Sequence, residues 1–226
     1  GRPRPAKRQR WLLAMPSDSP VLVTGPGEGG PSRPRAQVSQ GLRQQGGQGH
    51  PVGRVGNAVA APDLIDTRGV HGWGVEIDDE NVLAAIRNGI NIIQGNLERP
   101  LDEFADQAFD HVVLSRTLQT VRHTEGILRE MLRVGREAVV SFPNFAYWKN
   151  LRSVLDGRMP VSEDLPYQWY DTPNVRFFTL LDFEALCDQM GLVIRERHVL
   201  DEEGNLVEHE VNFLGSLAVY RLTLNR

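Results

Sequence analysis

The stretch His71–Asp78, with the sequence HGWGVEID, is the feature that most constrains the fold of this chain. Its pattern is typical of an apolar strand that ends on the acidic residues Glu76 and Asp78, and a helical pattern follows at once. The second strand of a nucleotide-binding βαβ unit has this form, with a carboxylate placed to accept from ribose hydroxyls. Such a unit carries a glycine-rich loop roughly 20 residues upstream, where this chain has only the poor match Gly53-Arg-Val-Gly56. The sequence therefore predicts half of a cofactor site.

The first 62 residues differ in composition from the rest of the chain. They hold nine Lys or Arg against two Asp or Glu, together with 11 of the 22 Gly and 9 of the 14 Pro. Residues 63–226 hold 16 basic and 27 acidic residues. A segment so rich in Gly and Pro cannot bury enough apolar surface to offset the entropy lost on ordering. We therefore predict that residues 1–62 are disordered or non-native and that residues 63–226 form one domain.

Charge pattern and cysteine content bear on partners and location. The basic residues of the first segment are scattered, with no interleaved aromatic residue beyond Trp11, so we expect no nucleic-acid binding. The single cysteine, Cys187, leaves no internal disulfide and fits a reducing cytoplasm. No apolar run approaches the ~20 residues that span a bilayer. The six His residues are dispersed, without metal-ligand spacing, and we expect a cytoplasmic protein with no metal site.

From Val70 onward, strand-like and helix-like patterns alternate, as in a chain of βαβ crossovers. In the helix-like segment 79–88, Val82, Leu83 and Ile86 are spaced to form one buried stripe. Thr179 and Asp182 have the spacing of a capping box. We predict strands over 72–77, 90–94, 109–114, 138–142, 192–200 and 214–222, and helices over 79–88, 124–134, 145–155 and 179–190. The fold class is α/β, an open sheet that is mostly parallel and ends in an antiparallel pair.

Several blocks of this chain match a known family. The matching blocks are Gly74-Val-Glu-Ile-Asp78, Ile93-Gln-Gly-Asn-Leu97, Phe109-Asp-His-Val-Val-Leu-Ser115, Thr117-Leu-Gln119, Glu130-Met-Leu-Arg-Val-Gly135, Ser141-Phe-Pro-Asn-Phe145, Met159-Pro-Val161 and Pro166-Tyr-Gln-Trp-Tyr-Asp-Thr-Pro-Asn174. Through these blocks, residues 64–226 resemble the MetW family (methionine biosynthesis protein MetW), within the class I S-adenosylmethionine-dependent methyltransferase superfamily. The resemblance implies a Rossmann-like sheet, S-adenosyl-L-methionine as cofactor, and a homoserine O-acyltransferase of L-methionine biosynthesis as partner.

The resemblance fails where the family has its first strand and a glycine-rich loop of the form V-L-D-L-G-C-G-x-G. The segment Val21-Leu-Val-Thr-Gly25-Pro-Gly27-Glu-Gly29 copies this form, but it lies 51 residues before Glu76 and lacks the acidic residue. We favour the alternative that the residues before about Leu64 are a frameshift product. Residues 53–64 can be encoded by codons that, when shifted by one base, specify a glycine loop at the expected distance from Glu76. On that hypothesis the first strand is missing or corrupted, and binding of S-adenosylmethionine is weak or lost.

Candidate cofactor-binding residues follow the predicted second, third and fourth strands. By resemblance, Glu76 accepts hydrogen bonds from the ribose hydroxyls, and Asn96, next to Leu97, faces the adenine. Glu76 and Asp78 could instead be solvated carboxylates at a helix N-terminus, Asp78 as its N-cap. Asn96 could be a polar turn residue. Ser115 ends the fourth strand, where it could line the methyl-transfer side or simply end the strand.

Aromatic residues gather after the fifth predicted strand. Trp148, Tyr167, Trp169 and Tyr170, with the neighbouring Asp171, could line a substrate pocket, anchor a protein interface or pack as a lid. We favour a partner interface over a small-molecule pocket.

Three functions remain open at this point. The first is an accessory protein of methionine biosynthesis that acts with homoserine O-acyltransferase. The second is an S-adenosylmethionine-dependent methyltransferase of a small acceptor, and the third is an NAD-type dinucleotide-binding domain. The antiparallel pair of strands at the C-terminus favours the methyltransferase fold over an NAD-type dinucleotide-binding domain. No residue is an evident general base, so we name no catalytic residue.

Overall fold

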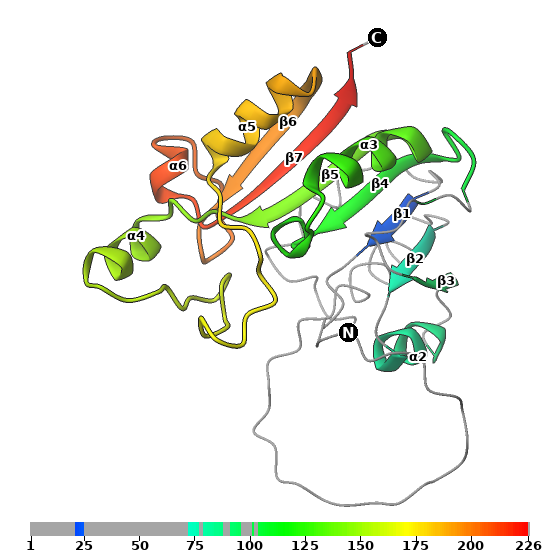
Figure 1. Ribbon diagram of the computed structural model, residues 1–226. Coiled ribbons are helices and arrows are strands. Elements are labelled where there is room, and N and C mark those ends of the chain that lie inside the picture. Colours follow the sequence, from blue (N-terminus) through cyan, green and yellow to red (C-terminus); the bar gives the residue numbers. More distant parts are fainter. Residues whose placement is uncertain are drawn as a thin grey trace, which may run out of the picture.

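A seven-stranded sheet runs through the computed structural model, which describes residues 21–24, 72–76, 79–87, 91–95, 101 and 104–225 (Figure 1). The strand order is β3-β2-β1-β4-β5-β7-β6. The strands are β1 (Val21–Thr24), β2 (Gly72–Glu76), β3 (Asn91–Gln94), β4 (Phe109–Ser115), β5 (Gly135–Pro143), β6 (Leu192–Leu200) and β7 (Leu217–Leu224).

Strands β1 to β5 pair in parallel, whereas β7 runs antiparallel to both β5 and β6. This arrangement confirms the predicted α/β class, the mostly parallel sheet and the antiparallel C-terminal pair. Because β7 lies between β5 and β6, the chain must first cross to the sheet edge and then return inward.

The helices agree with prediction in type, and less well at their ends. Thr179 caps α5 with both bonds of the capping box, through the backbone and side chain of Asp182.

The prediction of a buried stripe on α2 is wrong, because Leu83 and Ile86 are more than half exposed. Helix α2 lies near the edge strand β3, away from the middle of the sheet (Figure 1). None of the described helices is long and apolar enough to cross a membrane. The helices are α2 (Asp79–Arg87), α3 (Thr124–Val134), α4 (Trp148–Leu155), α5 (Leu180–Gln189), α6 (Val211–Leu214) and the short 3-10 helix η3 (Leu118–Thr120).

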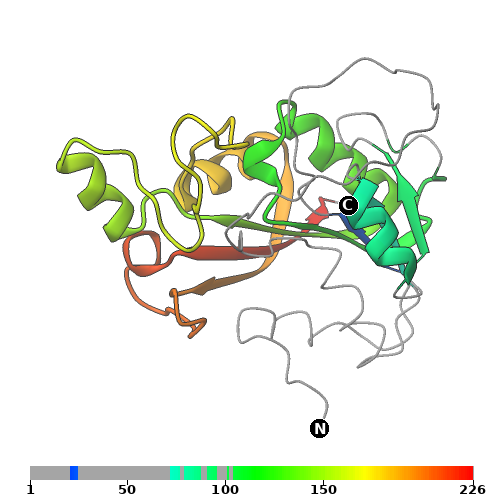
Figure 2. The ribbon, with the colours of Figure 1, turned by 90° about the horizontal axis from the view of Figure 1, so that it is seen from below.

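The core lies between the sheet and the helices α3 and α5, which cover the same face (Figures 1 and 2). Phe142, Phe183 and Tyr220 form its aromatic centre, with ring centroids 4.7 to 5.7 Å apart. Cys187 is buried beside them, as predicted, and burial raises the pKa of its thiol to about 12. A buried thiol that stays protonated fills space in the core and does not act as a nucleophile.

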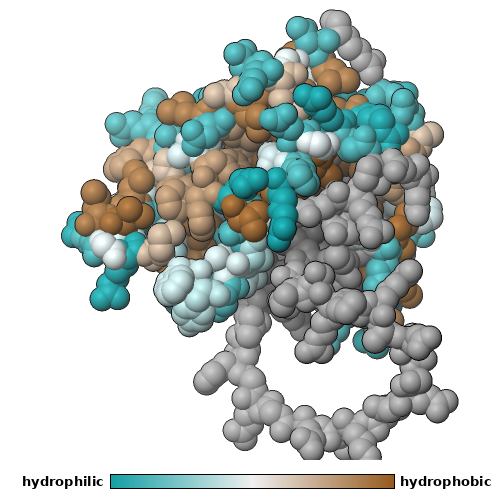
Figure 3. All heavy atoms as spheres, in the orientation of Figure 1, coloured by the Kyte–Doolittle hydropathy of each residue, from teal (hydrophilic) through white to brown (hydrophobic). Residues whose placement is uncertain are grey.

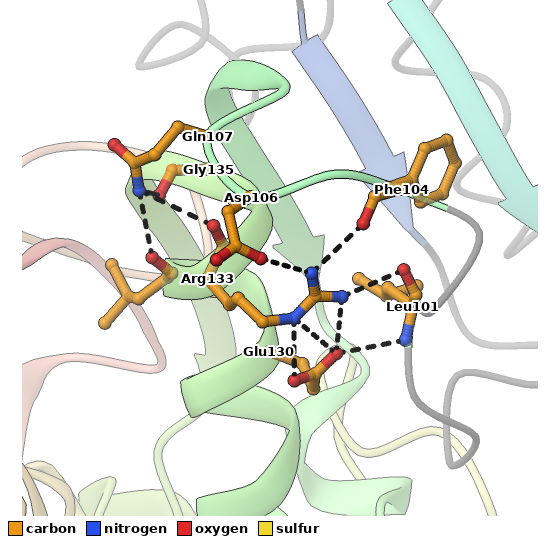
Figure 4. Close-up of polar contacts among 8 residues, drawn as sticks. Leu101, Phe104, Asp106, Gln107, Glu130, Arg133 and Gly135 are labelled. Atoms are coloured by element: carbon orange, nitrogen blue, oxygen red, sulfur yellow. Dashed lines mark hydrogen bonds and ion pairs between the residues drawn. The ribbon is translucent and has the colours of Figure 1, made fainter.

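Arg133, near the end of α3, holds the segment that leads into β4 (Figure 4). Its guanidinium donates to the carbonyls of Leu101 and Phe104, both at 3.0 Å, and to the carboxylates of Asp106 and Glu130. The carboxylate of Glu130, followed by that of Asp106, raises the pKa of Arg133 above its usual value. The block Glu130–Gly135 therefore has a structural explanation: it fixes where β4 begins.

Strand β1 occupies the centre of the sheet, between β2 and β4, and it comes from the N-terminal segment. Val21 pairs with Gly72 on one side and with His111 on the other. Val21–Thr24 therefore lie in the sheet, although they belong to the segment that composition predicts to be disordered or non-native; apolar and β-branched residues of this kind favour strands. The rest of residues 1–62 lies outside the described residues, and its non-native character stays a prediction.

Candidate functional site

The parallel strands end along one edge of the sheet, and the strand order reverses direction between β1 and β4. In open α/β sheets, ligands bind at the carboxyl ends of the strands at such a reversal. Glu76 is the last residue of β2, as predicted, and lies opposite Gln94 of β3. Its role as a ribose ligand stays a prediction. Asp78, Asn96 and Leu97 lie outside the described residues.

Ser115 ends β4, as predicted, and is buried opposite Ser141 of β5. The two hydroxyl oxygens are 3.4 Å apart. The next residue, Arg116, has a φ of 52°, a left-handed conformation that is costly for a side chain of this size. Its N–H donates to both the carbonyl and the hydroxyl oxygen of Ser141, at 2.8 and 3.1 Å. This pair of bonds stabilises the sharp turn by which the chain leaves the sheet.

The turn after β4 also holds the long segment that follows α4. Arg116 donates to the carboxylate of Asp164 at 2.6 Å, although the two residues are 48 positions apart. Further along, the carbonyl of Gln119 accepts from the N–H groups of Val175 and Arg176, both at 3.0 Å. The loop of residues 165–174, called the aromatic loop below, is therefore fixed at both ends to the same turn.

The aromatic loop presents its aromatic side chains outward. Trp169 and Tyr170 are 72% and 71% exposed and contact each other edge to face, with ring centroids 5.7 Å apart. Asp171 is exposed and Tyr167 is half-buried. A packed lid would bury the two exposed rings, so this alternative does not describe Trp169 and Tyr170.

Trp148 lies apart from that loop, at the first turn of α4, and is partly exposed. The ammonium group of Lys149 lies 5.7 Å from the centre of the Trp148 ring and 5.9 Å from that of Tyr147. Lys149 also pairs with Glu202. Burial, followed by the charge of Glu202, raises the pKa of Tyr147, so its hydroxyl stays protonated.

Asn144, fully buried after β5, determines how α4 and α6 are attached. Its side-chain N–H groups donate to the carbonyls of Asn212 and Gly215, both at 2.8 Å, and its side-chain oxygen accepts from Ala146 N–H at 3.1 Å. Its own carbonyl accepts from the side chain of Asn150 at 3.0 Å. One residue thus joins the end of β5 to α4, to α6 and to the turn before β7.

The residues Arg116, Asn144 and Asp164 were not among the predicted site residues. Asn144 belongs to a block that matches the MetW family, and this was the one available signal for it. Its partners Asn212 and Gly215, in and just after α6, are 68 and 71 positions away. No local sequence pattern predicts such contacts. Arg116 and Asp164 are likewise joined only by the fold.

Solved structures of other proteins share this architecture. An S-adenosylmethionine-dependent methyltransferase from Thermotoga maritima superposes with a TM-score of 0.62 at 15% identity, covering 97% of this chain and 88% of that chain. One from Archaeoglobus fulgidus superposes with a TM-score of 0.61 at 11% identity, covering 96% and 90%. The chain therefore has the fold of class I methyltransferases, with a strand-order reversal and a polar edge where such folds bind ligands.

A comparison with family models classifies the chain more specifically than the fold does. Residues 38–222 match the family described as methionine biosynthesis protein MetW, and this chain belongs to that family. The match begins upstream of the boundary that composition predicts at residue 62.

A bifunctional relative is also known. The bifunctional methionine biosynthesis protein MetXA/MetW of Rhodopirellula baltica is 43% identical over 139 residues, which are 60% of this chain and 22% of that protein. The chain thus spans about a fifth of the length of this relative.

Removing the Asn144 amide should destabilise the fold more than any exposed amide does. Asn144→Ala leaves the carbonyls of Asn212 and Gly215 without their donors, so we expect a loss of about 3 kcal/mol in the free energy of unfolding. Urea denaturation followed by circular dichroism measures this loss. Asn205→Ala, which removes an exposed amide bonded to Asp201, is the control and should cost less than about 1 kcal/mol. Equal costs for the two variants would contradict the role given to Asn144.

Proposed function

We propose that this chain is an accessory protein of methionine biosynthesis that acts by binding a homoserine O-acyltransferase in the cytoplasm. The observation that carries the proposal is the aromatic loop, whose two outward rings stand on a segment held at both ends. A rigid aromatic loop loses little conformational entropy on docking, and Trp and Tyr are favoured anchors at interfaces.

The surface around that loop is unusually apolar. Of the 17 large hydrophobic residues exposed within the described part of the chain, 13 lie in residues 148–181 and 206–214. These segments extend beyond the end of the sheet (Figure 2), and Figure 3 shows hydrophobic surface gathered over α4. Exposed apolar residues that cluster in this way support a protein–protein interaction.

The Rhodopirellula relative supports the choice of partner. Its name joins a MetXA part and a MetW part in one bifunctional protein. We infer that the MetXA part is a homoserine O-acyltransferase, the partner class implied by the MetW resemblance. Joining two modules raises their effective concentration to the millimolar range, which benefits modules that must contact each other.

A methyltransferase of a small acceptor is the second candidate, favoured by the strand-order reversal at β1 and β4. The backbone places Glu76 at the end of β2, next to β1, where a carboxylate can accept from ribose hydroxyls. The sequence after β1 contains Gly25, Gly27 and Gly29, which suits close approach of a ligand to the backbone. These residues fit S-adenosylmethionine, which would supply an activated methyl group. The acidic residue of the family loop is nevertheless missing, because Val23 stands in its place.

Affinity for S-adenosylmethionine separates the two candidates. Because the loop lacks its acidic residue, we expect calorimetry to give a dissociation constant weaker than about 100 μM. Glu76→Ala should then change little, as should the control Glu125→Ala on the exposed side of α3. A low-micromolar constant that Glu76→Ala abolishes and Glu125→Ala preserves would move the methyltransferase candidate ahead.

The partner is tested by co-purification and calorimetry with the homoserine O-acyltransferase of the same organism. Trp169→Ala and Tyr170→Ala together remove two exposed anchors, so we expect the complex to weaken at least ~10-fold. Circular dichroism should be unchanged, because both rings are exposed.

Trp73→Ala is the matched control, since Trp73 is a partly exposed tryptophan on β2, far from the aromatic loop in the chain. It should leave the complex intact. A complex that survives loss of both Trp169 and Tyr170 would show that the interface lies elsewhere. Absence of any complex with the unchanged chain would contradict the proposed partnership.

A further inference from the structure

A second feature of the same region is an open groove between α4 and α6. Its volume is about 380 Å³, and its lining residues are Ala146, Leu151, Glu210, Val211, Asn212 and Phe213. Four of the six are apolar, and Glu210 is the one acidic residue among them. A hollow of this size and composition fits an inserted side chain better than a whole helix.

The walls of the groove are fixed by contacts with the rest of the fold. Asn144 donates to the carbonyl of Asn212, while the side chain of Asn212 accepts from Leu180 N–H at 3.1 Å. Just past α6, Gly215 packs so tightly that a Cβ atom there would lie 2.0 Å from Cγ1 of Val199. The groove is thus formed before a partner arrives, which lowers the entropic cost of filling it.

The segment of residues 201–210, which leads into α6 and is called the acidic rim below, is rich in carboxylates. Residues 201–210 hold five Asp or Glu and no Lys or Arg. Glu202 is engaged by Lys149, whereas Glu203, Glu208 and Glu210 are exposed. A partner surface that fills the groove therefore gains most if it carries positive charge beside its apolar side chain.

Resting on the partnership proposed above, we propose that this groove, together with its acidic rim, is the anchoring pocket for the acyltransferase. The partner inserts an apolar side chain between α4 and α6 and places Lys or Arg beside Glu208 and Glu210. Leu151, which lines the groove, belongs to α4. The same helix also exposes Leu155, which is 83% exposed. Charge and shape together select the partner: the groove supplies the contact area, and the rim orients the approaching surface.

Two variants of the full chain test the groove. Phe213→Ala removes a wall residue that is 48% exposed, so the fold should persist while affinity for the purified acyltransferase falls about 10-fold. Glu208→Lys with Glu210→Lys reverses the rim. For the unchanged chain, affinity should fall as salt rises from about 50 to 300 mM, and the double variant should bind weakly without that fall. Leu224→Ala and Glu125→Lys, at surfaces away from the groove, are the matched controls and should bind normally.

The outcomes are distinct. If the complex forms and Trp169→Ala with Tyr170→Ala weakens it, but neither groove variant does, the groove inference is wrong and the partnership stands. If the unchanged chain forms no complex, the proposed function fails, and this inference fails with it. If Phe213→Ala instead dissociates a dimer of this chain in sedimentation, the groove binds a second copy and the inference is overturned.

Discussion

Asn144 is the residue on which the arrangement beyond the sheet depends. It lies where β5 ends; its side-chain amide bonds to α6, to the turn that enters β7 and to Ala146, and its backbone carbonyl accepts from Asn150 of α4. A buried amide is stable only when its donors and acceptor find partners, so each bond constrains the others. The position of α6 next to α4, and therefore the groove between them, follows from the contacts of this one residue.

Two candidate binding regions, one for a cofactor and one for a partner protein, are built from different segments of this fold. The carboxyl edge of the parallel strands has Glu76 at the end of β2 and Ser115 at the end of β4, and open α/β sheets bind ligands at this edge. The aromatic loop and the α4–α6 region lie beyond that edge and expose apolar surface to solvent. A shared fold does not determine a shared reaction, and here the exposed apolar residues lie mainly in the segments between β5 and α5 and between β6 and β7.

The regular elements were largely predictable from sequence, because each has a local cause. The period of α3 and the capping box at Thr179 depend only on neighbouring residues. The four residues of β1 were harder, since a Gly- and Pro-rich context hides a strand that is stabilised by neighbours on both sides. The four-residue helix α6 has no period long enough to recognise.

The candidate site was predictable only in part, and the reason is distance along the chain. Glu76 and Ser115 were found because strand ends can be located from local patterns. The contact of Arg116 with Asp164 joins residues 48 positions apart, and that of Asn144 with Gly215 joins residues 71 apart. Such contacts exist only once these distant parts of the chain have folded together. The aromatic residues were identifiable in sequence, but their exposure was not.

Hydrogen exchange of this chain, alone and in the presence of the acyltransferase, tests most directly whether the region beyond Asn144 is the interface. We expect the amides of α4, of the aromatic loop and of α6 to exchange more slowly in the complex, while those of α2 and β3 keep their rates. Protection confined to β2, β3 and α2, with α4 and α6 unchanged, would contradict the assignment of this region as the partner surface.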